Sequence, residues 1–325
     1  MPANLTPQYL EADRRYRQAT TPEEQLAALE EMMATIPKHK GTEHMRADIR
    51  RRMAKVRTEA ARKKAAAGGK GPTGHHVPPE GAGQIMLVGP PNAGKSRLLA
   101  ALSNASPVIA PYPFATRAPL PGMVPFEDVK IQLVDLPPIA PETAEPWLFS
   151  MIRQSDGALL VADLSDDDLL AGLEQTLELA GQSRVRLGRR GDGEGVLPSL
   201  LIAAKVDAPG AAERLEILRE IYGNRFPLLS VSAEDGTNLD VLRTEMWRLL
   251  DVIRIYTKAR GQRADKSAPF VLPRGTTVQN AAAAVHKDFV ERLKYARIWG
   301  AGTFDGQMVQ REHVLADGDV LELHA

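Results

Sequence analysis

The chain has 325 residues, 43% of them apolar, which is enough for two or three globular domains with their own cores. Its 41 basic residues equal its 41 acidic residues, so any contact with nucleic acid needs a local patch and not the charge of the whole molecule. The absence of cysteine excludes disulfides and thiolate metal sites. No apolar run approaches the roughly 18 residues of a membrane helix, and the first thirty residues hold no signal-peptide core. We therefore expect a cytoplasmic protein that does not contact membranes.

Residues 1–66 are predicted to form a helical arm. Thr21 precedes a proline and two glutamates, which is typical of a helix start, and apolar residues follow at helical spacing. After a break at residues 37–41, a second apolar repeat over Met45–Val56 predicts a helix that folds back on the first. Basic residues between Arg46 and Lys64 fit either contact with RNA phosphates or a solvated helix face. Residues 67–83 have the composition of a linker.

Residues 84–258 are predicted to form an α/β domain. Short apolar runs typical of buried strands alternate with helical patterns, which indicates a mostly parallel sheet with helices on both faces. The expected strands are Ile85–Val88, Val129–Val134, Ala158–Ala162, Leu200–Ala203 and Leu228–Val231. The glycine- and arginine-rich stretch 184–195 is expected to be a mobile loop, with RNA contact and simple solvation both left open.

A phosphate-binding loop follows the first strand and opens a helix. The spacing of Gly89, Gly94, Lys95 and Ser96 fits the P-loop pattern. Backbone N–H groups of such a loop surround phosphates, the lysine reaches the β and γ oxygens, and the hydroxyl of Ser96 binds Mg²⁺. The predicted nucleotide-binding residues of this segment are Gly89, Pro90, Pro91, Asn92, Ala93, Gly94, Lys95, Ser96 and Arg97.

Two further side chains are expected at the metal and the γ-phosphate. Thr116 lies in a proline-rich irregular stretch, where a loop can bring its hydroxyl to Mg²⁺. Asp135 ends the strand Val129–Val134, at the place where P-loop proteins keep the carboxylate that holds Mg²⁺. With Lys95, these two residues make up the predicted catalytic set.

Polar residues follow the last two strands of the α/β domain, at the edge where such sheets bind ligands. Lys205 and Asp207 follow Leu200–Ala203, and Ser232 and Ala233 follow Leu228–Val231. A carboxylate there can accept hydrogen bonds from guanine N1 and N2, a donor pair that adenine lacks. These four residues are the predicted base-binding set.

The C-terminal residues change to short strands around a single helix near Val278–Phe289, with a final strand at Val320–Leu323. This pattern predicts a linker over 259–268 and a separate α+β module over 269–325.

The ordered set of motifs resembles the five G motifs of translation-factor-class GTPases, and more closely the developmentally regulated GTP-binding proteins of the Obg branch. The closer likeness includes Ile36–His44, Tyr112–Thr116 with Pro121–Met123, and a tail similar to a TGS domain at Phe270–Gly275, His286–Phe289 and Tyr295–Gly300. The resemblance implies GTP or GDP with Mg²⁺ as ligands and a ubiquitin-like β-grasp tail. It also implies ribosome or RNA contact through arm and tail. Asn92 resembles an asparagine that helps to hold a potassium ion in related GTPases.

The chain departs from the family pattern at two motif positions. Asp135-Leu136-Pro137-Pro138 stands where Asp-x-x-Gly is expected, and a proline has no N–H to offer the γ-phosphate. Ala204 replaces an asparagine that braces the base site against the P-loop. Three functions therefore stay open: a GTPase on the ribosome or an RNA, a nucleotide-binding scaffold without productive hydrolysis, and an ATP-using enzyme. The signal, the oligomeric state and any stabilising protein partner are left open too.

Overall fold

The computed structural model of the chain describes residues 7–18, 22–35, 49, 76–103, 105, 118–141, 143–259, 262, 264–285, 293–300 and 304–324. The chain divides into two compact units, Met1–Gly74 and His75–Ala325. In the described part of the chain, no helix is long and apolar enough to cross a membrane.

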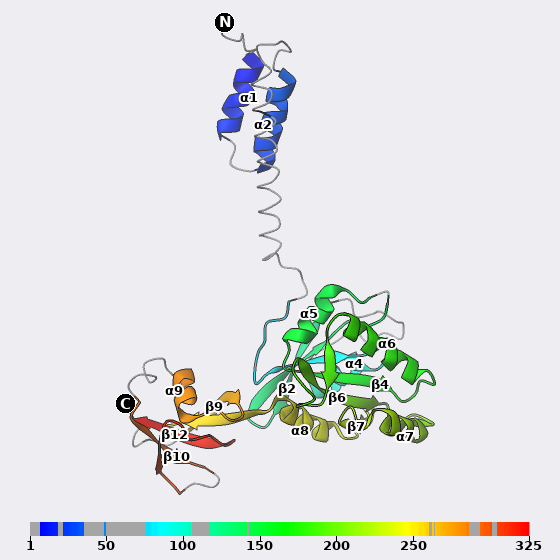
Figure 1. Ribbon diagram of the computed structural model, residues 1–325, viewed down its shortest axis with the longest axis vertical. Helices are drawn as coiled ribbons and strands as arrows, with labels where there is room; N and C mark the ends of the chain where they lie inside the picture. The colour runs from blue at the N-terminus through cyan, green and yellow to red at the C-terminus, as the bar shows by residue number, and fades with distance from the viewer. Residues whose placement is uncertain are drawn as a thin grey trace. The chain divides into compact units, whose positions relative to one another are not determined.

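The first unit contains the helices α1 (Pro7–Gln18) and α2 (Pro22–Thr35), which pack against each other (Figure 1). Ala12, Leu29 and Met32 are buried, and Arg15 pairs with Glu31 at 2.7 Å. α2 begins at the proline that the sequence indicated, whereas α1 was not predicted as a separate helix, because charged and other polar residues make up most of it. The helix predicted over Met45–Val56 lies outside the described residues except for Ile49.

The second unit begins with an α/β sheet whose strands lie in the order β2-β3-β1-β4-β6-β5, with β7 also paired to β6. β2 is antiparallel to β3, and the other pairs are parallel. The elements are β1 (Gln84–Val88), α4 (Lys95–Leu102), β2 (Leu120–Phe126), β3 (Val129–Asp135), α5 (Pro146–Gln154), β4 (Gly157–Asp163), α6 (Leu169–Gln182), β5 (Arg186–Gly188), β6 (Val196–Ala204), α7 (Ala211–Tyr222), β7 (Leu228–Val231) and α8 (Leu239–Leu250).

Helices cover both faces of this sheet, as the sequence predicted (Figure 1). One apolar core joins the sheet to α5, α6 and α7, and another joins it to α4 and α8. Because the strands are mostly parallel, the loops that follow β1, β3, β4, β6 and β7 leave the sheet at one edge. The motif residues of the described chain lie on these loops or at the ends of the strands and helix that border them.

The α/β domain begins before its first strand. Val77 packs on the core, Gly81 forms a bridge with Ile131, and the side-chain amide of Gln84 donates from Nε2 to the Val77 carbonyl at 3.0 Å. The last residues of the linker predicted over 67–83 are therefore part of the domain, because the backbone near Gly81 pairs with the neighbouring strand.

The glycine- and arginine-rich stretch 184–195 is more ordered than the sequence indicated. β5 lies within it, Arg189 donates to the Gly223 carbonyl at 2.5 Å, and Arg190 donates to the Leu249 carbonyl at 2.7 Å. Two of its arginines thus bind backbone carbonyls of the domain, which corrects the expectation of a mobile loop.

A second sheet has the strand order β11-β10-β12-β8-β9, with α9 packed on one face through Val278, Ala281 and Ala282 (Figure 1). Its elements are β8 (Val252–Thr257), β9 (Asp265–Pro273), α9 (Val278–Val285), β10 (Tyr295–Trp299), β11 (Gln307–Val309) and β12 (Asp319–His324). The boundaries predicted at 258 and 269 differ from this arrangement, because β8 pairs with β12 and β9 begins inside the predicted linker. An apolar strand pattern does not indicate which sheet the strand joins.

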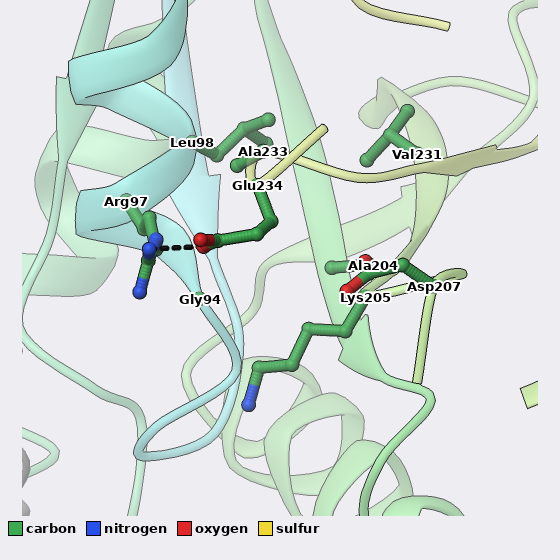
Figure 2. Close-up of a pocket in the computed structure, with 9 residues that line it drawn as sticks. All are labelled: Gly94, Arg97, Leu98, Ala204, Lys205, Asp207, Val231, Ala233 and Glu234. Atoms are coloured by element: carbon green, nitrogen blue, oxygen red, sulfur yellow. Dashed lines mark hydrogen bonds and ion pairs between the residues drawn. The ribbon is translucent and has the colours of Figure 1, made fainter. Parts of the chain in front are cut away.

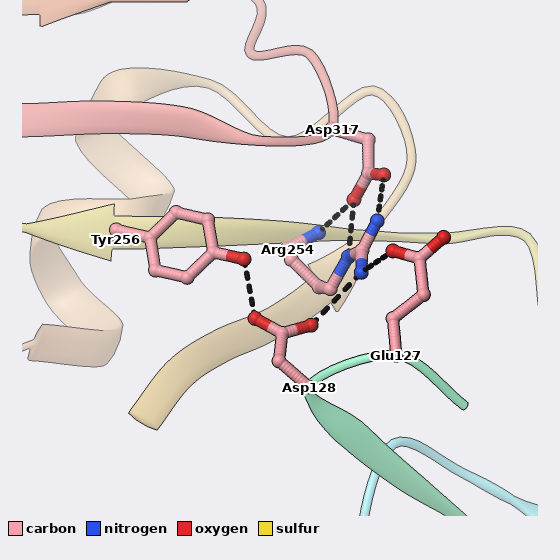
Figure 3. A network of polar contacts seen from close by, with 5 residues as sticks. All are labelled: Glu127, Asp128, Arg254, Tyr256 and Asp317. Atoms are coloured by element: carbon pink, nitrogen blue, oxygen red, sulfur yellow. Dashed lines mark hydrogen bonds and ion pairs between the residues drawn. The ribbon is translucent and has the colours of Figure 1, made fainter. Parts of the chain in front are cut away.

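The two sheets are joined by a polar cluster, which we call the Arg254 joint (Figure 3). Arg254 on β8 pairs with Glu127 and Asp128 in the β2–β3 turn and with Asp317 of the C-terminal domain. Its guanidinium also lies 5.1 Å from the ring centre of Trp247 on α8, and Tyr256 donates to Asp128. Hydrogen bonds from Arg254 hold the pKa of Asp317 below its usual range, and those from Tyr256 and Arg254 do the same for Asp128.

Candidate nucleotide-binding site

The loop between β1 and α4 depends on two glycines, Gly89 and Gly94, for its backbone conformation. A Cβ on Gly89 would lie 2.6 Å from the Val161 carbonyl oxygen, so no larger residue fits there. Gly94 adopts a left-handed conformation (φ 91°) as the N-cap of α4. Asn92 also has a positive φ of 58°, and its side chain is exposed. The loop thus turns sharply and presents the N-terminus of α4, which favours anions.

Lys95 is buried, with 6% of its surface exposed, and its ammonium is held at the loop. Nζ donates to the carbonyls of Gly89 at 3.0 Å and Pro90 at 2.8 Å. Burial lowers the pKa of Lys95 to about 8, although the nearby Asp135 carboxylate favours the charged form. A buried cation beside the loop suits an anionic ligand.

Ser96 and Asp135 bring two oxygen donors together beside this loop. The Ser96 hydroxyl donates to Asp135 Oδ2 at 2.5 Å, and Asp135 is fully buried at the end of β3, where it lies opposite Leu87 of β1. Hydroxyl and carboxylate oxygens are ligands that Mg²⁺ prefers, and Mg²⁺ commonly keeps water and phosphate as its other ligands. Among the described residues, no cluster of three His, Asp or Glu offers an all-protein metal cage. Thr116 lies outside the described residues.

The segment after Asp135 is packed into the domain. Leu136 and Ile139 have no exposed surface, and the Ile139 N–H donates to the Gly89 carbonyl at 3.1 Å. The Pro138 carbonyl accepts a hydrogen bond from the Thr143 hydroxyl at 2.5 Å. The position that the family pattern gives to a glycine N–H therefore offers no donor, and the next N–H is already bound to the phosphate loop.

A pocket of about 110 Å³ lies next to the loop, at the same edge of the sheet (Figure 2). It brings together three segments that are distant in sequence: the start of α4, the residues after β6 and the residues after β7. Its lining residues are Gly94, Arg97, Leu98, Ala204, Lys205, Asp207, Val231, Ala233 and Glu234. Four of the predicted nucleotide-binding residues, Arg97, Lys205, Asp207 and Ala233, thus line one pocket together with Gly94 of the predicted P-loop.

Lys205 and Ser232 shape the loops around this pocket. Lys205 has a left-handed backbone (φ 61°), and its ammonium lies 2.5 Å from Asp163 Oδ2 at the end of β4. Ser232 is fully buried, and its hydroxyl accepts the N–H groups of Glu234 at 3.1 Å and Asp235 at 3.3 Å. Ser232 therefore fixes the turn that places Ala233 in the pocket, and does not line the pocket itself.

The sequence did not single out Asp163 or Glu234. Asp163 ends β4 at the same edge of the sheet, and Glu234 directly follows the Ser232-Ala233 pair. The position of each residue after a predicted strand could therefore have indicated that it lies near the site. Glu234 forms an ion pair with Arg97.

Comparisons with known proteins identify relatives of both domains. A family model described as 50S ribosome-binding GTPase matches residues 84–186, and a TGS domain model matches residues 253–325. An uncharacterized GTP-binding protein of Methanocaldococcus jannaschii is 28% identical over 93% of this chain and 92% of its own length. Developmentally-regulated GTP-binding protein 1 of Xenopus laevis is 27% identical over 92% of this chain and 97% of its own length.

Among solved structures, a GTP binding protein from Pyrococcus horikoshii OT3 aligns with 74% of this chain and 99% of its own length. Its TM-score is 0.50 and the sequence identity is 16%, so this likeness concerns the fold alone.

Proposed function

We propose that this chain, a GTP-binding protein homologous to the developmentally regulated GTP-binding proteins and built from a GTPase domain and a TGS domain, is a magnesium-dependent GTPase with slow turnover. The observation that carries the proposal is the meeting of Lys95, Ser96 and Asp135 beside the phosphate loop. Phosphoryl transfer to water depends mainly on positioning and on neutralising charge, and these residues suit both tasks.

Each part of the site has a distinct task in this proposal. Ser96 and Asp135, with Thr116 as a third oxygen donor, would hold Mg²⁺, which when bound neutralises charge on the β and γ phosphates. Lys95 contributes a second positive charge, and the backbone N–H groups of the loop orient the phosphates. Asp207 accepts hydrogen bonds from guanine N1 and N2, which distinguishes guanine from adenine.

The segment after Asp135 is our reason to expect slow turnover. Pro138 has no N–H for the γ-phosphate, and the Ile139 N–H is held by the Gly89 carbonyl. One donor removed from a site that stabilises transition-state charge commonly lowers kcat by about 10²–10³-fold. The same observation favours a second candidate function, a scaffold that binds GTP or GDP without hydrolysing it.

Multiple-turnover phosphate release by the full chain separates the two functions. A GTPase gives turnover that Lys95→Ala abolishes and that Pro138→Gly raises. Nucleotide binding without phosphate release by the wild-type protein, combined with release by the Pro138→Gly variant, would establish the scaffold instead.

We also propose that K⁺ accelerates hydrolysis through Asn92. Its exposed amide carries an oxygen on the sharply turned phosphate loop, where a monovalent cation would add the positive charge that no assigned arginine supplies. Replacing K⁺ by Na⁺ should slow turnover in the wild-type protein but not in the Asn92→Ala variant, which lacks the side-chain oxygen. Equal turnover rates in K⁺ and in Na⁺ would contradict this part of the proposal.

The partner in this proposal is the ribosome or another RNA, met in the cytoplasm through the arm and the TGS domain. The outer face of the second sheet supports it, since β10 places exposed Arg297 between the half-buried rings of Tyr295 and Trp299. Met308, opposite Arg297, is 66% exposed. Aromatic rings with nearby cations can stack on unpaired bases. Co-sedimentation with ribosomes should fall in a Trp299→Ala, Arg297→Ala variant, and unchanged binding would exclude this face.

A further inference from the structure

In the pocket next to the phosphate loop, the position at the end of β6 carries no polar side chain. Ala204 lies at the end of β6 and lines the pocket with a methyl group, which can form no hydrogen bond to the loops on either side. Those neighbours are the start of α4, which continues the phosphate loop, and the turn at Ser232–Glu234. Any tie between them across the pocket must therefore come from other residues.

Arg97 and Glu234 supply such a tie. Arg97 extends from the first turn of α4, Glu234 extends from the turn after β7, and their charged groups form an ion pair beside the pocket (Figure 2). Both residues line the pocket, so the pair joins its two sides directly.

The supports of this ion pair are rigid. α4 packs its Leu98 and Leu99 in the core with no more than 1% of their surface exposed. The turn that carries Glu234 is fixed by the buried Ser232 hydroxyl, which accepts the Glu234 N–H at 3.1 Å. An ion pair between two fixed backbones orders less flexible chain than one between two mobile loops, so more of its attraction remains as net stabilisation.

We propose that Arg97 and Glu234 form a clasp that holds the two sides of the guanine pocket together and slows nucleotide release. The clasp takes over the bracing that Ala204 cannot provide, and this inference rests on the proposed binding of guanine nucleotide in this pocket. Arg97 and Glu234 are positioning residues here, because they act on the spacing of the loops and not on the phosphates.

The size of the effect follows from the exposure of the pair. The side chains are 55% and 61% exposed, and exposed ion pairs contribute at most about 1 kcal/mol. That limit corresponds to an increase of at most about fivefold in the dissociation rate when the clasp is broken. A higher salt concentration should also increase the dissociation rate from the wild-type protein, because salt screens exposed charges.

The test measures release of a fluorescent GDP analogue from the full chain after addition of excess unlabelled GDP. Arg97→Gln, Glu234→Gln and the double variant should each release it about three to five times faster than wild type, without additivity. The charge-reversed double variant, Arg97→Glu with Glu234→Arg, should recover slow release. Arg219→Gln is the matched control, because it breaks an exposed ion pair with Glu216 on α7, whose residues do not line the pocket.

A second background separates a clasp from a general loss of stability. In an Ala204→Asn protein, whose amide can reach the neighbouring loops, breaking the Arg97–Glu234 pair should have less than half of its wild-type effect. Additive single variants, an undiminished effect in the Ala204→Asn background, or equal acceleration by Arg219→Gln would each overturn the clasp. Failure of the wild-type chain to bind the GDP analogue would overturn the proposed function as well, so the two failures are distinguishable.

Discussion

At the scale of single residues, the buried charge of Lys95 lowers the free energy of unfolding of the nucleotide-free protein. The lowered pKa of about 8 means that the protonated amine is less favourable in the fold than in water. A shift from 10.5 to about 8 corresponds to roughly 3 kcal/mol at pH 7. A phosphate ligand would offset this cost.

Lys95→Met should therefore raise the free energy of unfolding of the nucleotide-free protein by about 1–3 kcal/mol and abolish nucleotide binding. The gain is smaller than the full shift because the carbonyls of Gly89 and Pro90 lose a hydrogen-bond donor. Urea denaturation of both proteins measures the difference. A less stable variant would show that the ammonium stabilises the empty site.

The sign of the pH dependence follows from the same pKa. Below pH 8 the lysine is protonated in both folded and unfolded chains, and the cost is fully present. Between pH 8 and about 10.5 the folded protein binds fewer protons than the unfolded chain, so the contribution of Lys95 to stability rises with pH. The stability difference between Lys95→Met and wild type should shrink over this range.

At the scale of elements, the Arg254 joint fixes the β2–β3 turn to β8. Asp128 is near one end of β3 and Asp135 ends it, so one strand connects the joint to the candidate metal site. Arg254 has only 11% of its side chain exposed, and three carboxylates surround it.

Arg254→Met should lower the free energy of unfolding by about 2–4 kcal/mol, because Asp128 and Asp317 would remain partly buried without a cation. Arg274→Met is the control, since its partner Asp251 lies at 2.8 Å but the arginine is 57% exposed; a loss below about 1 kcal/mol is expected. Urea denaturation compares the two variants. Equal losses would contradict a special role for the joint.

Acid should weaken this joint. The pKa values of Asp128 and Asp317 lie below those of free aspartate, so their contribution to stability is present above about pH 4 and is lost as the pH falls through the folded values. Wild type should therefore lose more stability than Arg254→Met between pH 5 and pH 3. Parallel pH profiles would show that Arg254 does not lower these pKa values.

The sequence predicted features whose residues are close together in the chain, and it did not predict contacts between residues that are far apart in the chain. The phosphate loop and the strand before it were predictable because glycine spacing and an apolar run are adjacent in the chain. The Arg254 joint was not, because Arg254 and Asp128 are 126 residues apart and neither belongs to a motif. The Arg97–Glu234 pair was missed because its two residues are 137 positions apart, although Arg97 was in the predicted nucleotide-binding set. β8 was not predicted as a strand, and its residues fell inside the predicted range 84–258 of the α/β domain, whereas β8 pairs with β12 of the second sheet.

At the scale of the whole molecule, every described residue of the candidate site lies in the second unit. A chain that begins at His75 should therefore bind GDP with the affinity of the full chain, within about twofold. Equilibrium titration with a fluorescent GDP analogue measures both. A loss of tenfold or more would show that residues 1–74 contribute to the site.

The same scale sets the role of the second sheet. β8 follows α8 with only Asp251 between them, and the Arg254 joint adds side-chain contacts from β8 to the β2–β3 turn. The TGS domain is thus bound to the GTPase domain by a short connection and a partly buried ion cluster. This arrangement suits a domain that presents a fixed surface to a partner.

Competition for bound fluorescent GDP by GTP and by ATP tests the central claim most directly. We predict that GTP displaces it from the wild-type chain at concentrations at least a hundredfold lower than ATP, and that Asp207→Asn weakens GTP at least tenfold while leaving ATP unchanged. Equal competition by ATP, or an Asp207→Asn variant that still prefers GTP as strongly, would contradict the assignment of this pocket to guanine.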